Sequence, residues 1–160
     1  MSGTLGRSAG SCKTWGSRIG ERRLDAAGFF QTVFTTSLRP DELLVGVRLP
    51  ILTVEHRVGF AEFSRRAGDF ALVMAAVVLE VRDGVVSTAA IGIGGAADVP
   101  VRATEAEQAL VGRPAIPETF EAAADVAAAS VRTLEDIHAS AEYRSDLVRA
   151  MTRRALVGAT

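Results

Sequence analysis

The sequence predicts an α+β domain in which a three- to four-stranded antiparallel sheet packs against about three helices. Two observations lead to this fold class. Patterns typical of strands follow one another in the middle of the chain, and patterns typical of helices follow them instead of alternating with them. In addition, Asp83-Gly84 separates two runs rich in β-branched residues, which is the strongest short-range signal for a hairpin.

Length and composition describe one compact domain. The chain has 160 residues, 48% of them apolar, with 18 basic and 19 acidic side chains. This balance argues against a nucleic-acid or membrane-surface protein, so small molecules and protein partners remain. No apolar run has the length of a spanning helix and no secretion signal is recognisable, so we expect a cytoplasmic protein. Cys12 is the single cysteine, and we expect neither a disulfide nor a metal site.

The first segment is basic and rich in Gly and Ser. Residues 1–24 show little periodicity and are predicted to form a poorly ordered arm. The alternative is an arm that binds phosphates, but such an arm would interleave aromatic side chains, and Trp15 stands alone. Residues 24–30 then predict a short helical turn with Asp25 as its N-cap, and residues 35–41 a loop.

Four strands are expected in the next stretch. Alternation over 43–49 predicts a strand that ends at Pro50, and 58–64 predicts a second strand. Residues 70–80 are nearly all apolar and favour a buried strand, although alanines leave a helix open for the first half. Residues 85–93 form the returning strand of the Asp83-Gly84 hairpin.

Three helices are expected in the second half. Thr104 and Glu107 have the spacing of a capping box, which predicts a helix that stops at Gly112. Pro117 opens a second helix over 118–131, and residues 134–140 form a loop. Ser140 caps a third helix. One face of this helix carries Tyr143, Leu147, Ala150, Met151 and Leu156, and its other faces carry Arg144, Arg149, Arg153 and Arg154.

Three groups of residues in the sequence are candidates for chemistry. Gly92, Gly94 and Gly95 superficially resemble a dinucleotide-binding loop, but that motif needs a helix directly after the glycines, so close packing or a sharp exit from the sheet is favoured. His56 and His138 lie in predicted loops without partners at the spacing of a catalytic triad. The sequence therefore offers no catalytic residue and points to a binding or assembly domain.

The most concentrated polar motif is Arg65-Arg66-Ala67-Gly68-Asp69, between two apolar strands. One interpretation is a turn that connects the strands, with Asp69 pairing an arginine or capping backbone donors. The other is that an arginine faces an anionic cofactor or another subunit. The residues by themselves leave both interpretations open.

Several blocks together resemble the flavin-carrying medium subunit of the molybdenum hydroxylases, the family of carbon monoxide dehydrogenase and xanthine dehydrogenase. Their order and spacing over residues 16–156 make the match specific. The blocks are Phe29-Phe30, Thr35-Thr36-Ser37-Leu38, Pro40-Asp41-Glu42-Leu43-Leu44, Val47-Arg48-Leu49-Pro50, Gly59-Phe60, Arg65-Arg66-Ala67-Gly68-Asp69-Phe70-Ala71, Gly92 to Gly95, Pro100-Val101-Arg102-Ala103, Glu142-Tyr143-Arg144 and Arg153-Arg154-Ala155-Leu156.

The resemblance implies a domain organisation and a function. Residues 1–15 match nothing in the family, residues 16–37 correspond to the end of the FAD-binding domain, and residues 38–160 correspond to the C-terminal domain. In this family the medium subunit holds FAD and relays electrons from iron–sulfur centres to an external acceptor. Its partners are a large molybdopterin subunit, which oxidises the substrate, and a small 2Fe-2S subunit.

The resemblance also implies cofactor-binding residues. Leu44 aligns with a residue whose backbone contacts the flavin, and Arg65, Arg66 and Asp69 match a motif near the isoalloxazine and the subunit interface. Ala61 stands where the xanthine dehydrogenase branch has a flavin-contacting lysine, so that contact is expected to be absent or made differently.

The family's two Gly-rich loops that wrap the FAD diphosphate lie upstream of the matched region. We therefore expect this chain alone to bind FAD weakly or not at all. The sequence also allows two other functions: a non-catalytic domain that docks to other subunits without its own flavin, and a phosphate-ligand binder that relies on the basic arm.

Overall fold

The computed structural model describes residues 11–16 and 20–160. The chain divides into two compact units, Met1–Leu52 and Thr53–Thr160. The domain boundary between residues 37 and 38, which the family resemblance implies, stays a prediction. The division into compact units falls later in the chain, because strand β5 (Glu42–Arg48) pairs with strand β1 (Ser11–Gly16) and thereby belongs to the first unit.

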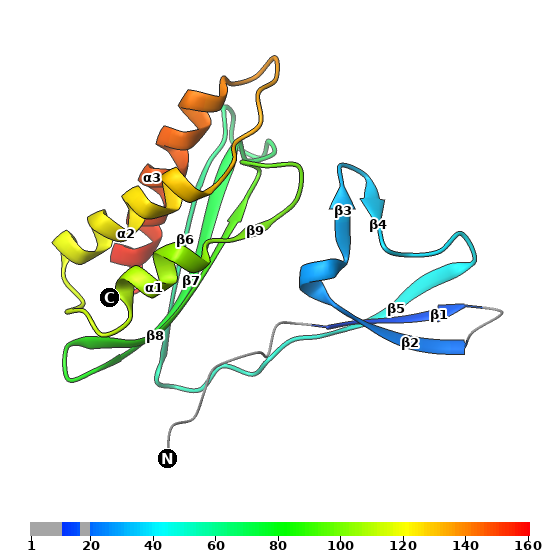
Figure 1. Ribbon diagram of the computed structural model, residues 1–160, viewed down its shortest axis with the longest axis horizontal. Coiled ribbons are helices and arrows are strands. Elements are labelled where there is room, and N and C mark those ends of the chain that lie inside the picture. Colours follow the sequence, from blue (N-terminus) through cyan, green and yellow to red (C-terminus); the bar gives the residue numbers. More distant parts are fainter. Residues whose placement is uncertain (1–10, 17–19) are drawn as a thin grey trace. The chain divides into compact units, whose positions relative to one another are not determined.

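The first unit contains a three-stranded antiparallel sheet in the order β2-β1-β5, where β2 is Gly20–Asp25 (Figure 1). Ser11–Gly16 thus form a strand, with a register shift against β5 between Lys13 and Thr14, where the sequence predicted a poorly ordered arm. Residues 1–10 and 17–19 of that arm lie outside the described part of the chain. The local pattern missed this strand because one of its two partners, β5, lies far along the chain.

Short elements join the sheet strands of the first unit. The helical turn predicted around Asp25 is the 3₁₀ turn η1 (Ala26–Gly28), and the Asp25 side chain makes no capping bond. Strands β3 (Phe30–Thr32) and β4 (Thr35–Thr36) then pair as a two-stranded ribbon. The Phe29 ring is buried and meets the Phe30 ring edge to face at 5.1 Å between centroids, which anchors the turn.

The second unit is built on a four-stranded antiparallel sheet. Its strands β6 (His56–Phe63), β7 (Val73–Arg82), β8 (Val85–Gly94) and β9 (Val101–Arg102) are neighbours in chain order. The hairpin between β7 and β8 is confirmed: Asp83 and Gly84 have φ of 51° and 76°, as a type I′ turn requires. His56, expected in a loop, begins β6.

Three helices cover one face of this sheet (Figure 1). They are α1 (Thr104–Leu110), α2 (Pro117–Ser130) and α3 (Ala141–Gly158). The predicted α+β class, with an antiparallel sheet followed by three helices, is confirmed.

The two predicted helix caps have opposite outcomes. The Ser140 hydroxyl accepts a hydrogen bond from the Tyr143 amide at 3.2 Å, so the cap of α3 is confirmed. The capping box at Thr104 is wrong, because Ala103 is the N-cap of α1 and no side chain caps that helix. Glu107 instead accepts the Ile91 amide at 2.8 Å and pairs with Arg102, so its carboxylate ties α1 to β8 and β9.

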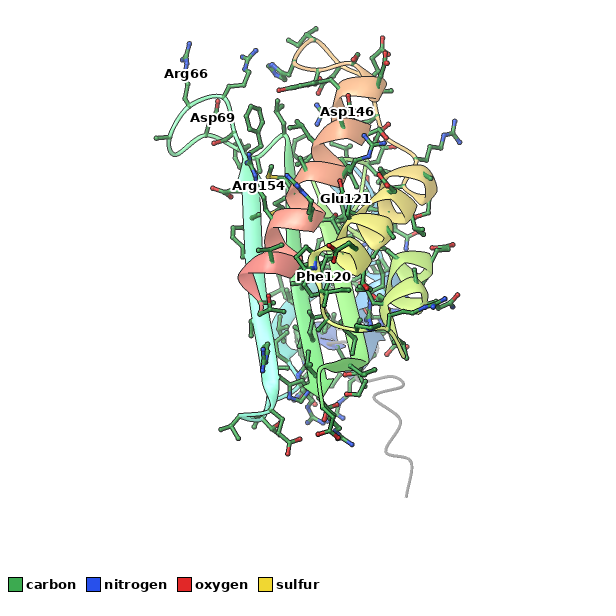
Figure 2. All side chains as sticks on the ribbon, turned by 90° about the vertical axis from the view of Figure 1, so that its left-hand side faces the viewer. Arg66, Asp69, Phe120, Glu121, Asp146 and Arg154 are labelled. Atoms are coloured by element: carbon green, nitrogen blue, oxygen red, sulfur yellow. The ribbon has the colours of Figure 1, made fainter. Side chains whose placement is uncertain are left out.

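The hydrophobic core lies between the inner face of the sheet and the helices. Phe120, from α2, is among its largest fully buried side chains and is labelled in Figure 2. Helix α3 lies close to β6 at Gly59, where a Cβ atom would stand 1.9 Å from the Ala155 carbonyl oxygen. The sheet and the third helix can therefore pack at this distance only around a glycine.

Candidate functional site

The polar motif forms a compact loop between β6 and β7. Its turn is closed by a hydrogen bond from the Asp69 amide to the Arg66 carbonyl at 3.1 Å, with Gly68 at φ 82°. The Ser64 hydroxyl also donates to the Arg66 carbonyl. The interpretation as a strand-connecting turn is therefore confirmed, and the Asp69 carboxylate accepts the Phe70 amide at 2.9 Å instead of an arginine.

The loop exposes two guanidinium groups and an aromatic ring. Arg65 and Arg66 are exposed, and neither has an ion pair within residues 11–16 and 20–160. Figure 2 shows Arg66 extending away from the loop at the end of β6. The Phe70 side chain is 95% exposed. A cationic, partly apolar tip of this kind can bind an anionic or carbonyl-bearing group.

A cavity of about 330 Å³ lies at the base of the loop. Its lining combines the loop with the exit of β8, the segment between α2 and α3, and the first turn of α3. The lining residues are Arg65, Asp69, Phe70, Ala71, Leu72, Gly95, Leu134, Asp136, His138 and Arg144. The structure thus brings two of the predicted site residues, Arg65 and Asp69, to one cavity.

Arg144 is the residue of this cavity that the sequence assigned wrongly. Its helical spacing placed it away from the apolar face of α3, but the structure buries it to 3% exposure. The guanidinium donates to the carbonyls of Leu72 and Gly95, both at 2.8 Å, and to Asp136 at 2.7 Å. Helical periodicity cannot reveal a buried arginine, because the carbonyls that satisfy it come from distant loops.

Leu44 lies on β5, in the first unit, and is 43% exposed. Since β5 pairs only with β1 among the described strands, its other edge has backbone groups without a strand partner. Leu44 and the β6–β7 loop belong to different compact units. The predicted site residues are therefore described within each unit by itself.

Strand β5 is held at its start by a buried ion pair. Two of the three guanidinium nitrogens of Arg22, Nε and Nη2, each donate to the Glu42 carboxylate at 2.6 Å. The same carboxylate also accepts the Arg39 amide at 2.8 Å. The Glu42 side chain is fully buried. The hydrogen bond from Arg22 lowers the pKa of Glu42 to about 2, so the carboxylate stays charged and fixes the residues that precede Leu44.

The glycines after β8 have a packing role. Gly95 has φ 75°, and a Cβ atom there would lie 2.8 Å from the carbonyl oxygens of Ala71 and Leu72. The chain then continues to β9 instead of entering a helix directly. This agrees with the predicted sharp exit from the sheet and excludes the dinucleotide-loop interpretation for these glycines.

The donor groups fit one part of FAD. In the first unit, β5 is an edge strand with backbone donors that have no strand partner, and in the second unit the guanidinium groups of Arg65 and Arg66 are exposed. Taken separately, each kind of donor is suited to the carbonyls and ring nitrogens of an isoalloxazine. The diphosphate normally requires a Gly-rich loop at a helix N-terminus, and no helix in the described residues begins with one. No group of three or more metal-binding side chains occurs in the same residues.

Comparison with known proteins identifies the family. Residues 59–159 match the model of the CO dehydrogenase flavoprotein C-terminal domain, and the chain belongs to that family. It is 39% identical over 140 residues, 88% of its length, to the nicotine 6-hydroxylase medium subunit of Paenarthrobacter nicotinovorans, of which it covers 49%. It is 31% identical to the xanthine dehydrogenase FAD-binding subunit of Escherichia coli O157:H7, across 86% of this chain and 48% of that subunit.

A solved structure gives the same result. A carbon monoxide dehydrogenase from Hydrogenophaga pseudoflava, lacking the Mo-pyranopterin moiety of the molybdenum cofactor, superposes with a TM-score of 0.88 at 32% identity, over 94% of this chain and 52% of that one. The resemblance seen in the sequence is confirmed. The chain spans about half the length of the curated relatives it matches.

None of its described helices is long and apolar enough to cross a membrane.

Proposed function

We propose that this chain forms the C-terminal part of the flavoprotein medium subunit of a molybdenum hydroxylase, where it helps to hold FAD and to relay electrons from iron–sulfur centres to an external acceptor. The observation that carries the proposal is the family match over residues 59–159. The partners are the large molybdopterin subunit and the small 2Fe-2S subunit, and the complex is cytoplasmic.

The chain's own residues have supporting roles in this function. When bound, FAD supplies one- and two-electron redox chemistry. The backbone at Leu44 contacts the flavin, and the positive charge of Arg65 and Arg66 stabilises an electron-rich ring system or an acidic partner surface. Asp69 shapes the turn that presents both arginines, as its bond to the Phe70 amide indicates.

A second candidate function is docking to other subunits without a flavin. Exposed apolar side chains on β6 favour it: Val58 and Phe60 are 58% and 60% exposed, and Met74 on neighbouring β7 is 38% exposed. An apolar sheet face of this kind is a typical protein-binding surface.

Flavin content distinguishes the two functions. The chain alone is titrated with FAD, and a chimera is made in which residues 20–160 replace the matching part of the nicotine 6-hydroxylase medium subunit. We expect weak or no binding by the chain alone, and a chimera that joins its large and small subunits and carries FAD. A colourless but assembled chimera would favour the docking function, and failure to assemble with either subunit would contradict both.

A further inference from the structure

Arg144 joins three segments that are far apart in the sequence. Its three hydrogen bonds reach Leu72 at the end of the β6–β7 loop, Gly95 at the exit of β8, and Asp136 between α2 and α3. The Arg144 side chain is 4% exposed, and its Nε atom has no hydrogen-bond partner among the described residues. A buried guanidinium is costly unless it is paired, and these three hydrogen bonds supply that pairing.

Asp136 is itself fixed in the position that receives Arg144. Its carboxylate accepts the amides of His138 and Ala139 at 2.8 and 3.0 Å. These amides, the His138 amide first, together with the Arg144 guanidinium lower the pKa of Asp136 to about 2. The acceptor for Arg144 is therefore charged and oriented at every pH at which the protein is expected to function.

The first turn of α3 holds both ends of the β6–β7 loop. At the start of the loop, the Phe63 ring packs edge to face on the Tyr143 ring at 6.3 Å between centroids. At the end of the loop, the Leu72 carbonyl accepts a hydrogen bond from Arg144, while the Leu72 amide donates to the Phe63 carbonyl at 2.8 Å. Between these ends, the loop has its own turn and carries Arg65 and Asp69 on the wall of the cavity.

We infer that Arg144 is a positioning residue that sets the orientation of the Arg65–Asp69 loop. Arg144 does not need to touch a ligand for this role, because it acts through the Leu72 carbonyl and through the Gly95 backbone that packs on the loop's end. What the loop contacts rests on the function proposed above. The orientation of the loop rests on the contacts of Arg144 within the second unit.

Trypsin tests the positioning directly in the 160-residue chain, because the loop carries two exposed cleavage sites, Arg65 and Arg66. Arg144→Lys keeps the charge but cannot reach all three acceptors, and Asp136→Asn removes the charged partner while keeping Arg144. Arg149→Met is the matched control, since it breaks two ion pairs of the same helix, with Asp125 and Asp146, away from the loop. Cleavage is followed by mass spectrometry under native conditions.

We expect cleavage after Arg65 and Arg66 to become several-fold faster in R144K and D136N, with no change at Arg57 or Arg102, and R149M to behave like the original chain. An equal increase at all sites would mean general destabilisation and would overturn the inference. Unchanged cleavage after Arg65 and Arg66 in both R144K and D136N would overturn the inference as well.

The FAD-containing chimera provides the functional readout. There, R144K is expected to release FAD several-fold faster and to alter the visible flavin spectrum, whereas R149M leaves both unchanged. If the chimera never binds FAD, the proposed function fails while the trypsin result still decides the positioning. If R144K loosens the loop but leaves the flavin spectrum and release rate unchanged, the link between the loop and the flavin is refuted.

Discussion

The buried Glu42 carboxylate is expected to make the stability of the first unit depend on pH. Its folded pKa of about 2 lies below the ordinary value of 4.5. A carboxyl with a lowered folded pKa stabilises the folded state above its unfolded pKa, and this contribution is lost as pH falls toward the folded value. The relevant window therefore runs from about pH 4.5 down to about pH 2.

The variant Glu42→Gln tests this dependence. We expect it to be less stable than the original chain at pH 7 and to lose less stability across the acidic window, because it has no charge to neutralise. Trp15 is the single tryptophan of the chain and lies on β1, so its fluorescence during urea unfolding reports on this unit. Glu21→Gln is the control, since the Lys13–Glu21 pair is exposed. Parallel pH profiles for the E42Q variant and the original chain would contradict the prediction.

The contact between α3 and β6 leaves no room for a Cβ atom at Gly59. Substitution by alanine would force a Cβ atom against the Ala155 carbonyl, and we expect a loss of about 1–3 kcal/mol in the free energy of unfolding, as for other overpacked cores. Gly158→Ala is the control, because nothing lies within 4 Å of its Cβ position, and it should be neutral or slightly stabilising. Thermal unfolding of both variants measures the difference, and equal stability of the two would refute the close approach.

At the scale of elements, the N-termini of α3 and α1 differ in whether the local sequence predicts the helix cap correctly. Ser140 caps α3 through its hydroxyl, so Ser140→Ala should cost about 1 kcal/mol. Thr104 is exposed, and among the described residues its hydroxyl bonds to the neighbouring Glu105, so Thr104→Ala should be close to neutral although its sequence context predicts a cap. Urea unfolding followed by circular dichroism compares them, and a larger loss for T104A than for S140A would show that the α1 cap is assigned wrongly.

At the scale of the whole molecule, the hydrophobic core belongs to the second unit. All residues of the main core cluster lie between Leu72 and Ala159, and the three α-helices lie in the same unit. We expect a chain of residues 53–160 to fold on its own, with a cooperative thermal transition and the helical circular dichroism of the 160-residue chain. A non-cooperative transition would show that the second unit depends on residues 1–52.

The sequence by itself determined the elements that local chemistry controls. The Asp83-Gly84 turn, the Pro117 start of α2 and the Ser140 cap depend on backbone dihedrals and on neighbouring donors, so short patterns are sufficient to predict them. The order of strands and helices then fixed the α+β class, and combined motifs fixed the family.

Only the tertiary structure decided what depends on distant partners. Strand β1 pairs with the distant β5 as well as with the neighbouring β2. Glu107 leaves its capping position because the Ile91 amide and Arg102 are nearby, and Arg144 is buried because Leu72, Gly95 and Asp136 surround it. Leu44 and the Arg65–Asp69 motif belong to different compact units, which no spacing along the chain reveals. A buried polar group is stable only where its partners converge, and that convergence is a property of the folded chain.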